Sequence, residues 1–207
     1  MTKETFLARK PEGVSFEEAA CLGTPGVTAW NGLVDKAKLQ PAQHVFINGC
    51  AGAVGVGAVQ IATLFGAKVS GSCSAQDMEK ARSFGVQTVY DYRTTDLSRI
   101  GARFDVVYDT ATTMKMSVGM QMLRPSGVFV DQDPGPSKFI RALLNRRLKL
   151  VIASPRAEIL EKIGDAARAG KFKIPIGEIV PLSHAAQLIT ELERGRRLGG
   201  KGVVAME

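Results

Sequence analysis

Short apolar runs alternate with helical stretches from about Gln43 to Ser154. Continuous apolar strands that alternate with helices are typical of a parallel sheet covered by helices on both faces. The expected strands span residues 44–48, 68–72, 88–92, 104–109, 128–131 and 150–153, and the expected helices span residues 53–65, 76–84, 114–123 and 137–149. Six such strands predict an α/β protein with a doubly wound six-stranded parallel sheet, the Rossmann fold.

The two ends of the chain follow a different pattern. Residues 1–20 contain no strand–helix unit of their own. The last part, from about Lys171, gives a short strand at 179–180, a helix at 183–193 and a final apolar run at 202–204. We therefore expect one Rossmann domain over residues 20–172, with residues 1–19 and 173–207 as flanking segments that complete another domain.

The net charge of +7 suits an anionic ligand as well as a nucleic acid. No block of five or more like charges occurs along the 207 residues, and aromatic residues make up only 6% of them. Nucleic-acid-binding chains more often concentrate their basic residues in patches or tails. The composition therefore favours a small anionic ligand, and no nucleic-acid partner is expected.

The cysteines and histidines do not form a recognisable metal-binding pattern. Cys21, Cys50 and Cys73 are widely separated without a CxxC pair, and His44 and His184 are far apart. A structural zinc ion needs four nitrogen or sulfur ligands, usually in paired spacing, so no metal is expected. Free thiols and the lack of a signal sequence or a sufficiently long apolar stretch predict a cytoplasmic protein without a membrane partner.

The most informative segment is the glycine loop at residues 48–55, which follows the first expected strand and opens a helix. Its spacing, Gly49-x-x-Gly52-x-x-Gly55, departs from the GxGxxG pattern. Glycines allow the backbone to approach a pyrophosphate closely, and the following helix presents free N–H groups to it. This context predicts a dinucleotide site; the alternative is that the glycines serve only helix–sheet packing.

The end of the second strand bears on which dinucleotide binds. The strand ends in Ser72, Cys73 and Ser74, and no acidic residue follows until Asp77. An NAD site would normally place an acid there, whereas small hydroxyl groups can bind a 2′-phosphate. The pattern favours NADP(H) over NAD. Alternatively, the serines form only a strand-to-helix turn with Ser74 as the N-cap.

An ordered series of motifs resembles the medium-chain dehydrogenase/reductases, in their zinc-independent quinone oxidoreductase branch. The resemblance covers nearly the whole chain. The matching segments are residues 10–20, 26–30, 49–55, 58–60, 89–92, 104–110, 123–127 and 200–204. The family resemblance implies NAD(P)H-dependent reduction of a small molecule: a quinone, an activated alkene (enone) or a carbonyl compound.

The resemblance also implies the cofactor-binding residues. Thr28 is expected near the nicotinamide, Gly52, Ala53, Val54 and Gly55 at the pyrophosphate, Ser72, Ser74 and Tyr92 at the adenosine phosphate end, and Thr110 and Asp131 along the cofactor groove. One departure weakens the NADP prediction. Relatives that bind NADPH often have a basic residue after the serine turn, where this chain has Gln76 and Asp77.

A larger departure concerns catalysis. Family members begin with a barrel-like catalytic domain, and this sequence resembles the cofactor domain without it, as a fragment or a naturally short form. No catalytic residue is predicted: residues four positions after Tyr90, Tyr92 and Tyr108 are not lysine, which argues against the short-chain dehydrogenases, and no P-loop or nucleophile elbow occurs. The alternative function is a nucleotide-binding module without turnover, such as a redox sensor.

Assembly is the last expectation. The sixth strand, expected at residues 150–153, would be a sheet edge with unpaired backbone groups, and in the family that edge commonly joins two subunits. A homodimer through this strand is therefore expected. Without a barrel, the apolar surface around Cys21 to Trp30 would be bare and prone to association. The alternative is a monomer whose edge is covered by residues 171–207.

Overall fold

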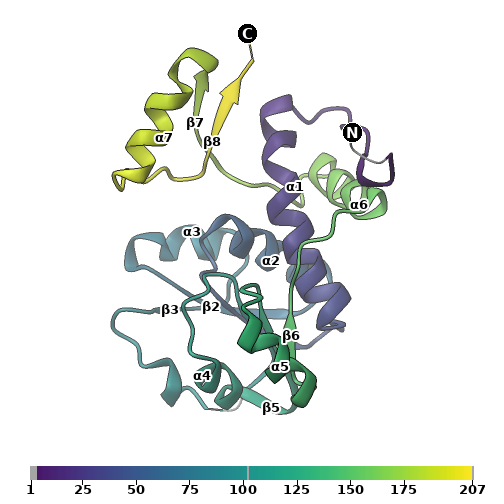
Figure 1. The fold of residues 1–207 in the computed structure, drawn as a ribbon, viewed down its shortest axis with the longest axis vertical. Helices are drawn as coiled ribbons and strands as arrows, with labels where there is room; N and C mark the ends of the chain where they lie inside the picture. The colour runs from purple at the N-terminus through teal and green to yellow at the C-terminus, as the bar shows by residue number, and fades with distance from the viewer. Residues whose placement is uncertain (1–3, 102, 207) are drawn as a thin grey trace.

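The computed structural model describes residues 4–101 and 103–206 (Figure 1). Six parallel strands form the main sheet in the order β3-β2-β1-β4-β5-β6. They are β1 (His44–Asn48), β2 (Lys68–Cys73), β3 (Thr88–Asp91), β4 (Phe104–Asp109), β5 (Leu123–Asp131) and β6 (Leu148–Leu150). The strand order reverses between β1 and β4, which confirms the predicted doubly wound α/β fold.

Helices cover both faces of this sheet. In chain order the helices are α1 (Phe16–Trp30), α2 (Ala53–Leu64), α3 (Met78–Ser83), α4 (Met116–Gln121), α5 (Pro136–Leu144), α6 (Ala157–Arg168) and α7 (Ala185–Glu193), of which α6 packs on α1 and α7 packs on β7 rather than on this sheet. A π-helical segment, η2 (Asn31–Lys36), continues α1, and the short 3-10 turns are η1 (Glu4–Phe6), η3 (Ala75–Asp77), η4 (Leu97–Arg99) and η5 (Leu182–His184). Neighbouring strand residues point to opposite faces of the sheet, and each face has its own hydrophobic core. Ile47 packs in the core that includes residues of α1, α2 and α6, whereas Phe46 packs in the core that includes residues of α4 and α5.

The helix α1 was not predicted from the sequence, and it runs across the boundary expected at residue 20. Ser15 and Glu18 form a reciprocal capping box that starts it. It packs against α2 and α6, with Trp30 edge-on to Phe65. The expectation of a bare apolar surface at Cys21–Trp30 is therefore wrong, because these two helices bury most of that segment within the chain itself.

Residues 124–127, which separate the helix expected at 114–123 from the strand expected at 128–131, lie inside β5. Phe104 pairs with Leu123 and Val106 pairs with Val128, so β5 has extra residues opposite one step of β4. These extra residues form a bulge rather than a chain reversal. The short strand expected at 128–131 is thus the regular half of a longer strand.

The last strand of the sheet is also displaced from its expected position. The helix expected to continue to residue 149 ends at Leu144, because the Asn145 side chain accepts a hydrogen bond from the Arg147 backbone and turns the chain. The strand β6 then forms at Leu148–Leu150 instead of residues 150–153. Val151 still donates to the Asp131 carbonyl at 2.9 Å, and the chain leaves the sheet beyond it.

The C-terminal part forms a separate two-stranded parallel sheet, β7 (Ile176–Pro181) and β8 (Lys201–Ala205), with α7 between them in sequence (Figure 1). Both expected strands fall within these longer ones, and the chain reaches them through α6, a helix that was not predicted. Within the described ranges, no helix combines the length and apolar character needed to cross a bilayer.

Candidate functional site

The glycine loop connects the carboxyl end of β1 to the start of α2. Gly49 has a φ of +80°, a left-handed conformation that glycine adopts without strain. The backbone N–H groups of Gly49 and Cys50 both donate to the Ser72 carbonyl, at 2.9 and 3.0 Å, so the loop is anchored to β2. A further bond of 3.0 Å from the Gly52 N–H to the Gly49 carbonyl closes the turn.

Two glycines of the loop serve different purposes. A side chain at Gly55 would overlap the backbone carbonyl of Gly49, so this glycine allows α2 to pack closely on the loop. At Gly52, an added Cβ atom would lie 3.4 Å from the same carbonyl oxygen, which is ordinary contact. Gly52 is the N-cap of α2, and its φ of −72° is accessible to any residue. The protein itself therefore leaves room at Gly52.

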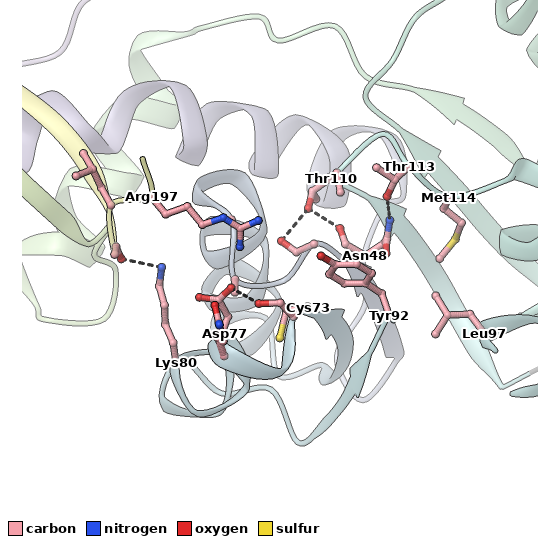
Figure 2. Close-up of a pocket in the computed structure, with 18 residues that line it drawn as sticks. Asn48, Cys73, Asp77, Lys80, Tyr92, Leu97, Thr110, Thr113, Met114 and Arg197 are labelled. Atoms are coloured by element: carbon pink, nitrogen blue, oxygen red, sulfur yellow. Dashed lines mark hydrogen bonds between the residues drawn. The ribbon is translucent and has the colours of Figure 1, made fainter. Parts of the chain in front are cut away.

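A cavity of about 800 Å³ opens above this loop (Figure 2). Its lining comes from the glycine loop, the carboxyl ends of β2 and β4, Tyr92 after β3, and the segment 197–199 before β8. Ligands of doubly wound sheets bind outside the carboxyl ends of the strands at the point where strand order reverses. The free N–H groups in the first turn of α2 lie at the loop, where they suit an anionic group.

The expected site residues are divided between the cavity and its surroundings. Gly49, Gly52, Ser74, Tyr92 and Thr110 line the cavity. Ala53 lines a smaller adjoining cavity of about 130 Å³. Thr28, Val54, Gly55, Ser72 and Asp131 are not among the lining residues of either cavity.

Thr28 and Asp131 contact other parts of the chain. The backbone carbonyl of Thr28, in α1, accepts a hydrogen bond of 3.1 Å from the buried Tyr108 hydroxyl. The buried carboxylate of Asp131 forms an ion pair of 2.7 Å with Lys138. Burial alone lowers the pKa of Lys138, but hydrogen bonds to Asp131 and Asp133 outweigh this effect and raise the pKa overall. Asp131 therefore anchors the first turn of α5.

A buried polar network beneath the loop was not predicted. The Ser72 hydroxyl donates to the Asn48 amide oxygen at 2.7 Å, and the Asn48 amide nitrogen donates to Asp109 at 2.7 Å. Asp109 also accepts hydrogen bonds from the backbone N–H groups of Ala111 and Met114. The network joins the ends of β2, β1 and β4, so Ser72 supports the loop from below. Its only signal in the sequence is one polar residue at the end of each of these strands.

Ionic groups gather at the β2 side of the cavity. The Ser74 hydroxyl donates to the Asp77 carboxylate at 2.6 Å. Lys80 donates to the Gly199 carbonyl at 2.9 Å, which ties α3 to the C-terminal segment. Figure 2 shows the Arg197 side chain extending from that segment into the same region. Ser74 occupies an N-cap position, but its hydroxyl makes no capping hydrogen bond.

Comparison with known proteins agrees with this arrangement. The family described as zinc-binding dehydrogenase matches residues 84–204. The chain belongs to this family of medium-chain dehydrogenase/reductases. It is 30% identical to a chloroplast envelope quinone oxidoreductase homolog of Arabidopsis thaliana, over 88% of this chain and 60% of that protein. It is also 30% identical to a 2-methylene-furan-3-one reductase of Solanum lycopersicum, over 95% of this chain and 49% of that protein.

Solved structures of related proteins have the same fold over nearly the whole chain. A NAD-dependent alcohol dehydrogenase superposes with a TM-score of 0.82 at 28% identity, covering 100% of this chain and 63% of that one. The quinone oxidoreductase from Coxiella burnetii also gives 0.82, at 27% identity, covering 96% of this chain and 63% of that one. The predicted family resemblance is confirmed. The chain spans about 60% of the length of the first of its curated relatives.

The described residues provide no ligand set for the zinc ion in the family's name. Within residues 4–101 and 103–206, no three His, Cys, Asp or Glu side chains gather closely enough to hold a metal ion. All three cysteines are buried and free, and burial raises the pKa of Cys50 and of Cys73, so both thiols stay protonated. The described residues do not fit a zinc ion.

Proposed function

We propose that the chain is the dinucleotide-binding part of an NAD(P)H-dependent oxidoreductase that reduces a quinone, an activated alkene or a carbonyl compound. The observation that carries the proposal is the cavity above the glycine loop, bordered by the N-terminus of α2. The names of the relatives, which include quinone oxidoreductases and a furanone reductase, support the substrate class.

Each part of the cavity has a task in this proposal. The backbone at Gly52 and Ala53, at the N-terminus of α2, holds the pyrophosphate, the Ser74 side holds the adenosine, and Thr110 borders the nicotinamide half. The bound cofactor supplies the hydride, and the chain positions it. In this proposal the groups that bind the substrate lie outside this chain, which covers about 60% of its first curated relative.

The test combines binding with turnover. Calorimetry with NADPH and NADH measures cofactor binding by this chain, and loss of reduced-cofactor absorbance with a panel of quinones and enones measures reduction. Binding with turnover is the expected result for the complete protein. Binding without turnover in the complete protein would favour a nucleotide-binding module, and no binding by this chain would overturn the cofactor site.

We propose NADP(H) as the preferred cofactor. Lys80 and Arg197 line the cavity beside Ser74, and two cations favour a ligand with an additional phosphate. NADPH should bind more tightly than NADH in calorimetry. The difference should shrink as salt is added, because salt screens charges at an open site. Equal affinities at low ionic strength would contradict the preference.

We propose a homodimer through the open edge at β6. The C-terminal segment does not cover this edge with a strand, because β7 and β8 pair with each other. Beside the edge, α5 exposes Phe139, Ile140, Leu143 and Leu144, the last two each 85% exposed. An apolar helix face next to an unpaired strand is a surface that a second copy can bury.

Ile152→Pro should convert this dimer into a monomer. The Val151 N–H makes the last bond to its own sheet, and the next residue, Ile152, is 60% exposed at the open edge, where its N–H can donate to a second copy. Proline at position 152 removes that donor and leaves the sheet intact. Val151→Pro, in contrast, would remove the hydrogen bond from the Val151 N–H to β5. Light scattering measures the change, with Ile152→Ala as the control that retains the N–H. A monomeric unmodified chain at all concentrations would refute the dimer.

The cytoplasm is the proposed location. All three cysteines are free thiols, as expected in a reducing compartment. One relative is named for the chloroplast envelope. Localisation of a tagged chain in its own cell tests the proposal.

A further inference from the structure

The cavity has one acidic group on its adenosine side. Among the described residues that line the cavity, Asp77 is the single carboxylate, and Lys80 and Arg197 are the two cations. The Asp77 carboxylate accepts the Ser74 hydroxyl at 2.6 Å. Figure 2 shows Asp77 beside Cys73, with the Arg197 side chain extending into the same region.

The position of Asp77 is defined by the local backbone. Its N–H donates to the Ser74 carbonyl at 3.0 Å, which closes the short turn η3 directly after β2. In a doubly wound dinucleotide site, the residue after the second strand contacts the adenosine ribose. The sequence places no acid at the end of β2 itself, but the turn brings the Asp77 carboxylate back to Ser74.

The Asp77 carboxylate remains available for a ligand. Within the described residues, the ion pairs do not include Asp77, and Lys80 instead donates to the Gly199 carbonyl. An acceptor-only carboxylate with a single hydrogen-bonded partner can accept further donors. The two hydroxyl groups of an unmodified ribose are such donors, whereas a 2′-phosphate has none when ionised and carries like charge.

We infer that Asp77 is the specificity-determining residue of the cofactor site, and that it keeps NADH usable by accepting from the ribose hydroxyls. The inference rests on the proposed function and sharpens it. With NADPH, the carboxylate must release Ser74 and turn toward Lys80 or Arg197 before the phosphate can occupy the space. Asp77 therefore limits the preference for NADPH that the two cations create.

The experiment uses adenosine fragments, so its readout does not depend on turnover. Calorimetry measures binding of adenosine 5′-monophosphate and adenosine 2′,5′-bisphosphate to the unmodified chain and to Asp77→Asn. The variant should shift the affinity ratio toward the bisphosphate by about tenfold or more, because it removes a repulsive charge and a strong acceptor. Both ligands contain the same base and 5′-phosphate, so the ratio isolates the 2′ position.

Glu79→Gln is the matched control. Glu79 lies two residues along, in α3, and it is largely exposed and paired with Arg82 outside the cavity lining. This variant loses the same charge and should leave the ratio within about twofold, since exposed charges act weakly at a distance. An equal shift in both variants would mean that net charge alone sets the ratio, and the role of Asp77 would be overturned.

A second background separates direct contact from an indirect effect through Ser74. In a Ser74→Ala chain, Asp77→Asn should still shift the ratio toward the bisphosphate, because the carboxylate itself meets the ligand. Loss of the shift in that background would mean that Asp77 acts only by occupying the serine, which overturns the inference. If neither fragment binds the unmodified chain, the cofactor site itself fails; if both bind and Asp77→Asn changes nothing, only the inference fails.

Discussion

Gly52→Val should weaken NADPH binding by about a hundredfold or more while the chain stays folded. The backbone at Gly52 has an extended conformation that valine adopts readily, and an added Cβ atom meets only ordinary contact. The extra methyl groups project into the cavity that the proposed pyrophosphate occupies. The loss therefore comes from blocked approach of the ligand. Calorimetry measures the affinity, and circular dichroism with thermal unfolding checks the fold.

Gly135→Val is the matched control for this experiment. Gly135 is also a helix N-cap with an extended backbone, at the start of α5, and an added Cβ atom there meets no atom within 4 Å. It does not line the main cavity. The control should bind NADPH as the unmodified chain does. Unchanged affinity in a folded Gly52→Val chain would remove the glycine loop from the cofactor site.

Asp109→Ala should lower the free energy of unfolding by about 3–5 kcal/mol. The substitution leaves the backbone N–H groups of Ala111 and Met114 without their acceptor and removes one of the two acceptors of the Asn48 amide nitrogen, which keeps only the Thr113 hydroxyl. Buried donors without a partner are costly because water cannot replace the lost bond. Denaturant unfolding followed by circular dichroism measures the change.

Asp131→Ala is the comparison that isolates this effect. Asp131 is the register neighbour of Asp109 on β5 and is equally buried. Its partner Lys138 is partly exposed and retains Asp133, so the variant should cost less than about 2 kcal/mol. Equal losses for the two variants would mean that general burial, and not the network beneath the loop, sets the cost.

Local patterns were enough to predict the sheet and the loop. Continuous apolar runs such as 44–48 and 104–109 are read directly as buried strands, and both are observed with those bounds. The glycine spacing at 49–55 predicted a tight connection between a strand and a helix, which the structure contains. These features depend on neighbours within a few residues, so a single sequence carries them.

Elements whose form depends on distant partners were missed. The helix α1 contains Gly23, Pro25 and Gly26, which disfavour helix locally, yet packing on α2 and α6 stabilises it. Similarly, the bulge in β5 follows from its pairing with β4, and the strand β6 from its register against β5. Tertiary contacts outweighed local preference in each case.

The sequence by itself determined the fold class, the family and the glycine loop, because periodicity and short motifs are local properties of a chain. Only the tertiary structure decided which polar groups share the cavity. It brings Arg197 to the part of the cavity lined by Ser74 and Lys80, although more than one hundred residues separate them in the sequence. The hydrogen bond from Lys80 to the Gly199 carbonyl joins the same two segments. It also turns Ser72 inward to Asn48. Side-chain direction and long-range contact follow from packing, which no spacing along the chain specifies.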